Sequence, residues 1–403
     1  MSHIGVSRSS RDFRLAPALS FEIRWRTMLD PVFDLPEPRS LILRMDITNT
    51  CNLDCIGCFL VDGRKIMQEP AAAMKIEIFE KIATEVFPYL KSVALSCEAE
   101  PTLHPQFGRV MQIIADKTER NTKLPVRMTT NATLLTGGRL DAIFDAGIFG
   151  LSISIDGFTR ETFAKVRKKG EIEKVFEAMD EIVRRKAALG RGAMDLPRLF
   201  INYTLMKSTL SELIPLIEYS RRWPLEGLVV THVYSSGTRD MRYESLSDWP
   251  EQSNRVLLEA EQLCRQYGIP FQFPLLFPPI TAKPSFWQWF RRNRQQAAVS
   301  PPIPVPVEPE LACAAPWNMI KIRWDGSVHP CDLWNSTQPF GTLQRQSFHE
   351  IWMSQKYTDL RSSLFRNMPT FEQCRKCDRV SQDNLEKRKI QTPLAHTSVH
   401  QVK

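Results

Sequence analysis

The fold of this chain is decided at residues 41–58, which read LILRMDITNTCNLDCIGC. An apolar run of strand length, Leu41–Ile47, leads into a short loop that carries Cys51, Cys55 and Cys58. Three thiolates on one loop can ligate three irons of a four-iron cluster, whereas complete ligation by protein takes four cysteines. The spacing therefore predicts an iron–sulfur cluster with one iron open to a substrate or cofactor.

Strand-length apolar runs alternate with amphipathic stretches beyond this loop. The helical stretches include Gln106–Thr118, Ile172–Leu189 and Leu210–Arg222, and the pattern Thr209-Leu-Ser-Glu212 predicts a capping box at the start of the last. Six strand–helix repeats are typical of an α/β fold with a parallel sheet or barrel. The predicted strands are Leu41–Ile47, Ser92–Ser96, Val126–Thr130, Leu151–Asp156, Leu199–Met206 and Leu228–Tyr234.

The fourth predicted strand separates polar from apolar side chains. Ser152, Ser154 and Asp156 share one face, because successive residues of a strand point to opposite sides. In a barrel the apolar face packs on the helices and the polar face points into the lumen, where ligands gather at the carboxyl ends of the strands. An open sheet with two solvated serines is the alternative.

The cysteine loop resembles the signature of the radical S-adenosylmethionine (SAM) enzymes, in which the open iron binds the amino and carboxylate groups of that cofactor. The resemblance implies a partial (β/α)6 TIM-like barrel. It continues in four further segments, each at the end of a predicted strand or just beyond it. These are Ser96–Pro101, Thr130–Ala132, Ser154–Gly157 and Lys165–Arg167.

The same resemblance implies which residues contact the cofactor. Glu100 matches the position that binds the amino group of SAM, and Ser154 is placed near its carboxylate. Arg167 matches a downstream basic position, where a guanidinium suits bidentate carboxylate binding. Asn202, on the fifth predicted strand, is a further candidate contact. No residue is assigned a catalytic role of its own.

Five further positions near this predicted site need comment. Gly57 stands where members of the family often have an aromatic residue that packs on the adenine, and Phe59 is the candidate substitute. Cys97 places a thiol near the proposed radical site. We favour a small buried apolar role for it over that of a hydrogen-atom donor. His232 shares a strand face with Tyr234, so both are candidates to line the lumen.

A second group of cysteines lies near the carboxyl end of the sequence. Cys313, Cys331, Cys374 and Cys377 can enclose zinc tetrahedrally or saturate a four-iron cluster, and the spacing alone does not choose. With Gly326, their order resembles the twitch domain, a shortened form of the SPASM extension of radical SAM enzymes. The resemblance implies one auxiliary [4Fe-4S] cluster, and thus two clusters in the chain.

Composition divides the chain into five parts. We predict an N-terminal extension over 1–38, the barrel over 39–275, a Pro-rich linker or insertion over 276–310, a small α+β cluster-binding twitch domain over 311–380 and a polar tail over 381–403.

Two local patterns shape the predicted twitch domain. Asp325-Gly326 between two short apolar runs predicts a two-residue hairpin. Ser347-Phe-His-Glu350 predicts a capping box that opens a helix ending near Phe365.

Charge and cysteine usage limit the location and the partners. The net charge of +8, from 53 basic and 45 acidic residues, is too mild to indicate nucleic-acid binding by itself. No apolar run of about 18 residues predicts a membrane span. Nine cysteines, an odd number, without a signal-like segment favour reduced thiols that bind metal, and hence the cytoplasm.

The resemblance implies that the chain cleaves SAM reductively to a 5′-deoxyadenosyl radical, which removes a hydrogen atom from substrate. It implies an external low-potential electron donor, similar to flavodoxin or ferredoxin. We expect oxidation of a small molecule such as an aminocyclitol or a sugar alcohol. A peptide maturase that forms cross-links or epimerises residues is the alternative within the family. A non-catalytic zinc protein that binds nucleic acid is the alternative outside it.

Overall fold

The computed structural model describes residues 35–58, 69–95, 98–120, 123–190, 196–233, 240–277, 313–334, 338–366 and 368–377. The predictions for Phe59, Cys97 and Tyr234 lie outside these ranges, as do nearly all of the N-terminal extension and the Pro-rich segment and the whole polar tail. Within these ranges, no helix combines the length and the apolar character that crossing a membrane requires.

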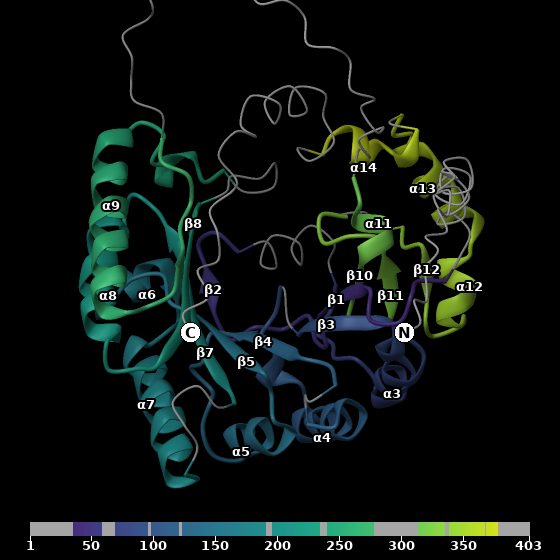
Figure 1. The fold of residues 1–403 in the computed structure, drawn as a ribbon, viewed down its shortest axis with the longest axis horizontal. Coiled ribbons are helices and arrows are strands. Elements are labelled where there is room, and N and C mark those ends of the chain that lie inside the picture. The colour runs from purple at the N-terminus through teal and green to yellow at the C-terminus, as the bar shows by residue number, and fades with distance from the viewer. Residues whose placement is uncertain are drawn as a thin grey trace, which may run out of the picture.

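Six parallel strands, in chain order along one curved sheet, form the body of the molecule (Figure 1). All six predicted strands are present, with their ends shifted by a few residues. This confirms the predicted α/β class and the partial barrel. The strands are β1 (Leu41–Met45), β3 (Leu90–Leu95), β4 (Val126–Thr130), β5 (Gly150–Ser154), β7 (Arg198–Leu205) and β8 (Leu225–His232).

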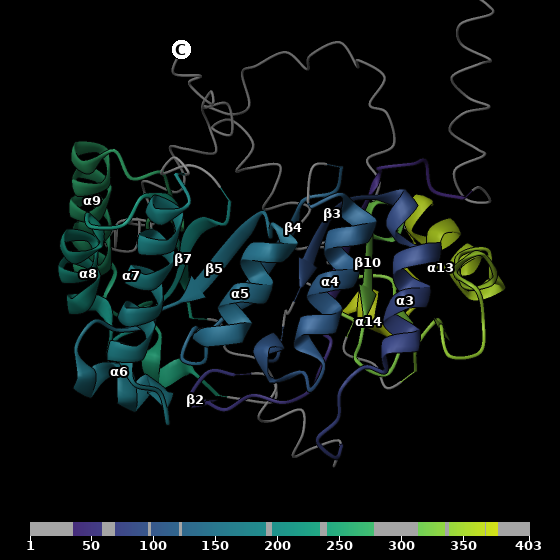
Figure 2. The same ribbon diagram turned by 90° about the horizontal axis from the view of Figure 1, so that it is seen from below.

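Helices cover the convex face of this sheet, as the view from below shows (Figure 2). Alternate strand residues such as Leu43, Val126 and Leu151 are fully buried against them, because the period of two sends every second side chain outward. The opposite face therefore lines the lumen. The helices are α3 (Ile76–Glu85), α4 (Phe107–Thr118), α5 (Gly137–Ala146), α6 (Arg160–Val166), α7 (Ile172–Ala188), α8 (Leu213–Ser220) and α9 (Pro250–Tyr267).

The carboxyl-terminal segment extends the same sheet. Strand β10 (Met319–Ile322) pairs in parallel with β1, and β11 (Ser327–His329) and β12 (Gly341–Thr342) follow in antiparallel fashion. At the other edge, β9 (Phe271–Gln272) pairs with β8. An open barrel leaves β1 with unpaired backbone groups, and β10 satisfies them. The predicted twitch segment is therefore continuous with the barrel sheet.

The predicted two-residue hairpin has a loop of three residues. The Arg323 N–H donates to Ser327 O at 3.0 Å, and the Gly326 N–H donates to Arg323 O at 2.9 Å. The prediction was wrong because Arg323 still pairs with Ser327. The extra residue needs a left-handed position, and Gly326 supplies it with φ of 78°.

Two predicted helix starts have different outcomes. The capping box of Ser347 and Glu350 is confirmed at the start of α12 (Phe348–Trp352). The helix predicted to run to Phe365 is broken, because Ser354 caps a second helix, α13 (Gln355–Phe365).

The capping box predicted at Thr209 is wrong. Its hydroxyl accepts from the Met206 N–H at 3.0 Å, and Glu212 instead binds the loop after β5. In this chain the glutamate of the Thr209 pattern accepts from donors of a distant loop and not from the start of the helix.

Candidate active site

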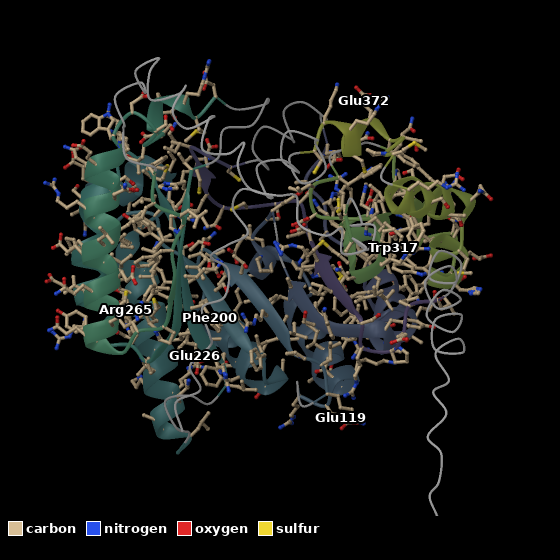
Figure 3. All side chains as sticks on the ribbon, turned by 45° about the horizontal axis from the view of Figure 1, so that its top comes forward. Glu119, Phe200, Glu226, Arg265, Trp317 and Glu372 are labelled. Carbon is tan, nitrogen blue, oxygen red and sulfur yellow. The ribbon has the colours of Figure 1, made fainter. Side chains whose placement is uncertain are left out.

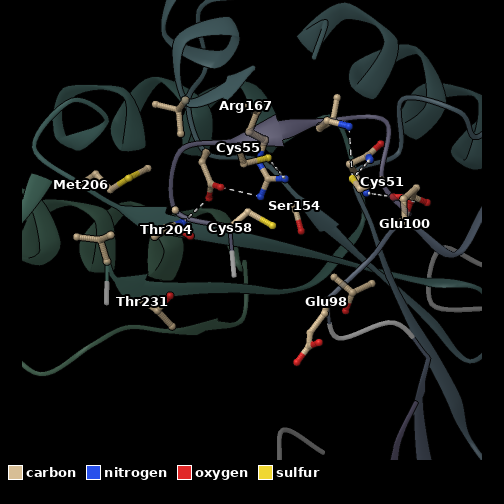
Figure 4. A pocket seen from close by; sticks show the side chains of 18 of the residues that line it. Cys51, Cys55, Cys58, Glu98, Glu100, Ser154, Arg167, Thr204, Met206 and Thr231 are labelled. Atoms are coloured by element: carbon tan, nitrogen blue, oxygen red, sulfur yellow. Dashed lines mark hydrogen bonds and ion pairs between the residues drawn. The ribbon is translucent and has the colours of Figure 1, made fainter. Parts of the chain in front are cut away.

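A cavity of about 370 Å³, the upper cavity, lies at the carboxyl ends of the barrel strands (Figure 4). Its wall contains the three cysteines of the loop after β1, together with the predicted cofactor contacts Glu100, Ser154 and Arg167. Asn202 is not among the described residues that line it, although Thr204, two residues further along the same face of β7, is. The structure thus brings six of the seven residues predicted for this site to one cavity.

A two-stranded sheet fastens the cysteine loop to the end of α6. Strand β2 (Asp54–Cys55) pairs antiparallel with β6 (Arg167–Lys168), so that Cys55 lies opposite Arg167. The Ile56 N–H also donates to Val166 O at 2.9 Å. Two residues leave no periodic signal in a sequence, which is why the sequence analysis missed this pairing.

The sulfur atoms of the loop face polar donors as well as the cavity. The Leu53 N–H and the Asn131 amide lie 3.4 and 3.8 Å from Cys51 Sγ, and an Arg167 guanidinium nitrogen lies 3.9 Å from Cys55 Sγ. Burial raises the pKa of Cys55 to about 12, against the opposing effect of Arg167. A bound metal would therefore supply the positive charge that turns the Cys55 thiol into a thiolate.

Glu100 is a buried acceptor held by the chain itself. Its carboxylate accepts from Thr102 Oγ1 at 2.6 Å, Thr130 Oγ1 at 2.8 Å and the Asn131 N–H at 2.8 Å. Burial raises the pKa of Glu100, and these hydrogen bonds oppose the rise. The residue thus joins the loop after β3 to the end of β4, beside the cysteine loop.

Arg167 forms an ion pair that the sequence analysis did not assign. Its guanidinium lies 2.6 Å from Asp156 Oδ2, and Asp156 Oδ1 accepts from the Thr204 N–H at 2.6 Å. Both side chains are nearly buried, with 13% and 8% exposed. The alternating Ser-x-Ser-x-Asp pattern had placed Asp156 on the lumen face but could not name its partner.

The remaining wall of the upper cavity comes from the ends of β7 and β8 and from the loop after β3. Met206 and His232 contribute there, and the His232 ring lies 4.7 Å from that of Phe277. Burial lowers the pKa of His232, so that the ring is neutral near pH 7. Glu98 also lines the cavity and pairs with Lys321, a buried residue of β10.

A second cavity, of about 30 Å³, collects all four cysteines of the carboxyl-terminal group. Cys313 precedes α11 (Ala315–Asn318), and Cys374 lies on α14 (Glu372–Arg375). Burial raises the pKa of Cys331 to about 11 and that of Cys374 to about 12. Four sulfur donors among apolar side chains such as Leu333 suit a thiolate-bound centre.

Each of the two cysteine groups lines a cavity. Within the described ranges, no three His, Cys, Asp or Glu side chains converge on a position where they could hold a single metal ion. A cluster holds its thiolates further apart than one ion does, because irons and sulfides lie between them. Three cysteines at the upper cavity and four at the second cavity match the ligand numbers of an open and a closed four-iron cluster, so the residues present at both sites fit such clusters.

Comparisons with known proteins place the chain among its relatives. A curated relative from Pyrococcus furiosus, the tungsten-containing aldehyde ferredoxin oxidoreductase cofactor-modifying protein, is 23% identical over 78% of this chain and 82% of its own length. The AdoMet-dependent heme synthase of Methanosarcina barkeri is 24% identical over 77% and 81%.

Solved structures share the fold at low sequence identity. The Streptococcus suis protein SuiB, bound to its precursor peptide SuiA, has a TM-score of 0.59 at 13% identity, over 88% of this chain and 74% of SuiB. The protein anSMEcpe with bound AdoMet has a TM-score of 0.55 at 18% identity, over 84% and 87%.

Two family models match the two parts that hold the cysteines. Residues 45–215 match the radical SAM superfamily, and residues 313–378 match SPASM, an iron–sulfur cluster-binding domain. The second match decides between zinc and iron–sulfur at the carboxyl-terminal cysteines, in favour of a cluster. The cofactors are thus SAM and two four-iron clusters. The chain belongs to the radical SAM superfamily and is an enzyme of that superfamily with a SPASM-type domain.

Proposed function

We propose that this radical SAM enzyme oxidises a small molecule by removing a hydrogen atom from one of its carbons. The observation that carries the proposal is the division of seven cysteines into three around the upper cavity and four around a separate apolar one. When bound, SAM and the clusters supply a 5′-deoxyadenosyl radical for hydrogen removal and an acceptor for the electron that the substrate then loses. Aminocyclitols and sugar alcohols are the proposed substrate class.

The chain's own residues hold and shield this site. Cys51, Cys55 and Cys58 would ligate the first cluster, and the pairing of β2 with β6 fixes their loop. Ser154 lies on the wall, where its hydroxyl could bind a SAM carboxylate. The ion pair of Asp156 and Arg167 keeps a guanidinium beside Cys55, which favours a thiolate there.

The predicted roles of Glu100 and Arg167 as direct SAM contacts stay proposals. Each already has partners within the chain, so each must share its donors or acceptors with the cofactor. The proposed electron donor is a flavodoxin- or ferredoxin-like protein.

Peptide modification is the second candidate function. It is favoured by the likeness of fold to SuiB, which was solved with its precursor peptide, and to anSMEcpe, which was solved with the Cp18Cys peptide. The names of the two curated relatives, a cofactor-modifying protein and a heme synthase, favour a non-peptide substrate instead.

The first test is SAM cleavage by the anaerobically reconstituted full chain. We expect about eight irons per chain and 5′-deoxyadenosine formation under strong reductant. Replacing Cys51, Cys55 and Cys58 by alanine should abolish this product. Cys264→Ala is the matched control, because Cys264 is buried in α9 away from both sites. Continued cleavage by the triple variant would contradict the assignment.

Oxidation is tested separately with a panel of aminocyclitols and sugar alcohols. A variant with Cys374→Ala and Cys377→Ala should still cleave SAM but release little oxidised product per 5′-deoxyadenosine. An unchanged ratio, with the fold intact by circular dichroism, would show that the second cluster is structural and that the chemistry is redox-neutral.

A further inference from the structure

A cavity of about 330 Å³ lies between the middle of β3 and the amino-terminal ends of β4 and β5. We call it the lower cavity. The fold comparisons and the proposed chemistry give it no role. Its lining residues are Ser92, Val93, Ala94, Pro125, Arg127 and Phe149.

One layer of the sheet at this level carries an unusual number of cations. The strand registers align six residues across β10, β1, β3, β4, β5 and β7, and four of the six are basic. In that order they are Lys321, Arg44, Ala94, Arg127, Gly150 and Arg198. Like charges at one level of a sheet repel each other, so each needs a counter-charge.

Three of these four cations have a carboxylate partner. Lys321 pairs with Glu98, Arg44 lies 3.8 Å from Asp332, and Arg198 lies 3.5 Å from Glu226. Within the described ranges, Arg127 has no carboxylate partner, and it is exposed to the cavity. Among the described residues of this layer, the guanidinium of Arg127 is thus open to solvent or to an anionic ligand.

Two aromatic rings fix the guanidinium of Arg127. Its central carbon lies 4.7 Å from the ring centre of Phe200 and 5.3 Å from that of Phe149. Phe200, labelled in Figure 3, occupies space that a side chain at position 150 would take, since a Cβ on Gly150 would lie 2.9 Å from its ring. Stacked rings occupy the face of a guanidinium and leave its N–H edge for acceptors in the same plane.

The lower and upper cavities are both lined by residues of one face of β4. Thr129, two residues beyond Arg127 on the same face of β4, lines the upper cavity. At a rise of about 3.3 Å per residue, the two positions are about 7 Å apart. A substrate whose charged end is held at Arg127 would have to extend along this face of β4 to reach the upper cavity.

We propose that the lower cavity is a substrate subsite in which Arg127 binds the carboxylate or phosphate group of a small anionic substrate. The proposal deepens the function proposed above and depends on it for the identity of the ligand as a substrate. A planar N–H edge matches the two oxygens of either group. It follows that the substrate class is narrowed to acidic small molecules or phosphate esters, such as an acidic or phosphorylated derivative of a cyclitol or sugar.

The test uses small aromatic probes and the full chain with both clusters reconstituted. Benzoate, phenylphosphonate and the neutral benzamide are titrated by saturation-transfer NMR, without reductant. Benzoate or phenylphosphonate should bind with a Kd of about 1 mM, and benzamide at least tenfold more weakly. The stronger of the two anions shows whether the natural group is a carboxylate or a phosphate.

Arg127→Gln should weaken anion binding about tenfold or more. Arg265→Gln is the matched control, because Arg265 also stacks on a phenylalanine and lies far along the chain on α9. Arg127→Lys keeps the charge without the planar fork and should bind with intermediate affinity, which gives an answer even if the glutamine variant does not fold.

Equal binding of the anions by wild type and by the folded Arg127 variants would overturn the proposal, as would benzamide binding as tightly as benzoate. Probe binding needs no turnover. A chain that binds the anions but cleaves no SAM would instead contradict the function proposed above.

Discussion

Asp156 and Glu100 are both carboxylates buried in the wall of the upper cavity, but their partners differ in kind. Asp156 faces the cation of Arg167, whereas Glu100 is held by hydroxyl and backbone donors that carry no full charge. A buried charge without an opposite charge is costly, which is why the pKa of Glu100 is raised. Asp156 secures the cysteine loop through Arg167. Glu100 instead connects the loop after β3 to the end of β4, beside the cysteine loop.

The ion pair of Asp156 should matter for stability. In Asp156→Asn the buried Arg167 loses its counter-charge, and we expect a loss of about 3 kcal/mol in the free energy of unfolding, measured by urea denaturation. Asp240→Asn is the control, because its pair with Arg242 is exposed and should leave the midpoint unchanged. Equal effects of the two substitutions would show that burial does not determine how much the Asp156–Arg167 pair contributes to the free energy of unfolding.

His104 should make stability depend on pH. Its Nε2 lies 2.8 Å from Met74 O, and its Nδ1 accepts from the Gln106 N–H at 3.1 Å, which requires a neutral ring. Burial lowers its pKa in the fold below the ordinary 6.5. The unfolded chain therefore binds the proton first, and stability falls as pH drops below about 6.5.

His104→Gln should remove part of this pH dependence. Glutamine keeps an N–H donor for Met74 O but does not titrate, so the midpoint of unfolding should change less between pH 7 and pH 5 than in wild type. Thermal unfolding at several pH values measures this. If the midpoint changes with pH as much as in wild type, groups other than His104 cause the pH dependence of stability.

At the scale of elements, two short contacts position the loops around the upper cavity. The two residues of β2 fix the cysteine loop on β6, and Glu212, just before α8, binds the loop that follows β5. That loop begins α6, whose end forms β6. Glu212 therefore acts indirectly on the position of the cysteine loop.

Glu212→Gln should loosen the loop between β5 and α6. The carboxylate accepts from the N–H groups of Phe158 and Thr159 and from Thr159 Oγ1, and an amide replaces these charge-assisted bonds poorly. We expect about tenfold faster amide hydrogen exchange at residues 158 and 159. Glu218→Gln, on the exposed side of α8, is the control and should leave exchange there unchanged. Faster exchange in both variants would contradict the proposal that Glu212 holds the loop between β5 and α6.

At the scale of the whole molecule, the cluster-binding segment completes the barrel sheet. Strand β10 covers the edge of β1, the same strand that leads into the cysteine loop. Lys321 of β10 pairs with Glu98 in the wall of the upper cavity, and Arg44 of β1 pairs with Asp332, next to Cys331. The two cysteine groups are therefore joined by backbone pairing and by charge.

Removal of this segment should destabilise the barrel. A chain ending at residue 312 exposes the edge of β1, and we expect a lower midpoint of thermal unfolding and a greater tendency to aggregate. A chain ending at residue 380 keeps β10, β11 and β12 and is the control. If the shorter chain unfolds at the same temperature as the full chain, the two parts are independent.

The strand–helix alternation, the lumen face of β5 and the grouping of the cysteines were predicted from the sequence, because each depends on local period or spacing. The sequence also indicated the family through the loop of Cys51, Cys55 and Cys58. It did not predict that β10 adds to β1, that Asp156 neutralises Arg167, or that Arg127 stands in a layer of cations without a carboxylate partner among the described residues.

These features belong to the tertiary structure for one physical reason. Local spacing determines which way a side chain points, but a partner distant in the chain is chosen by which surfaces pack together. Glu212 illustrates this, since the same four-residue pattern that caps a helix at Ser347 instead binds a loop 53 residues away. The sequence by itself determined which kind of metal centre the cysteines can bind. Only the folded sheet decided which charged side chains surround that centre, because those side chains come from distant parts of the chain.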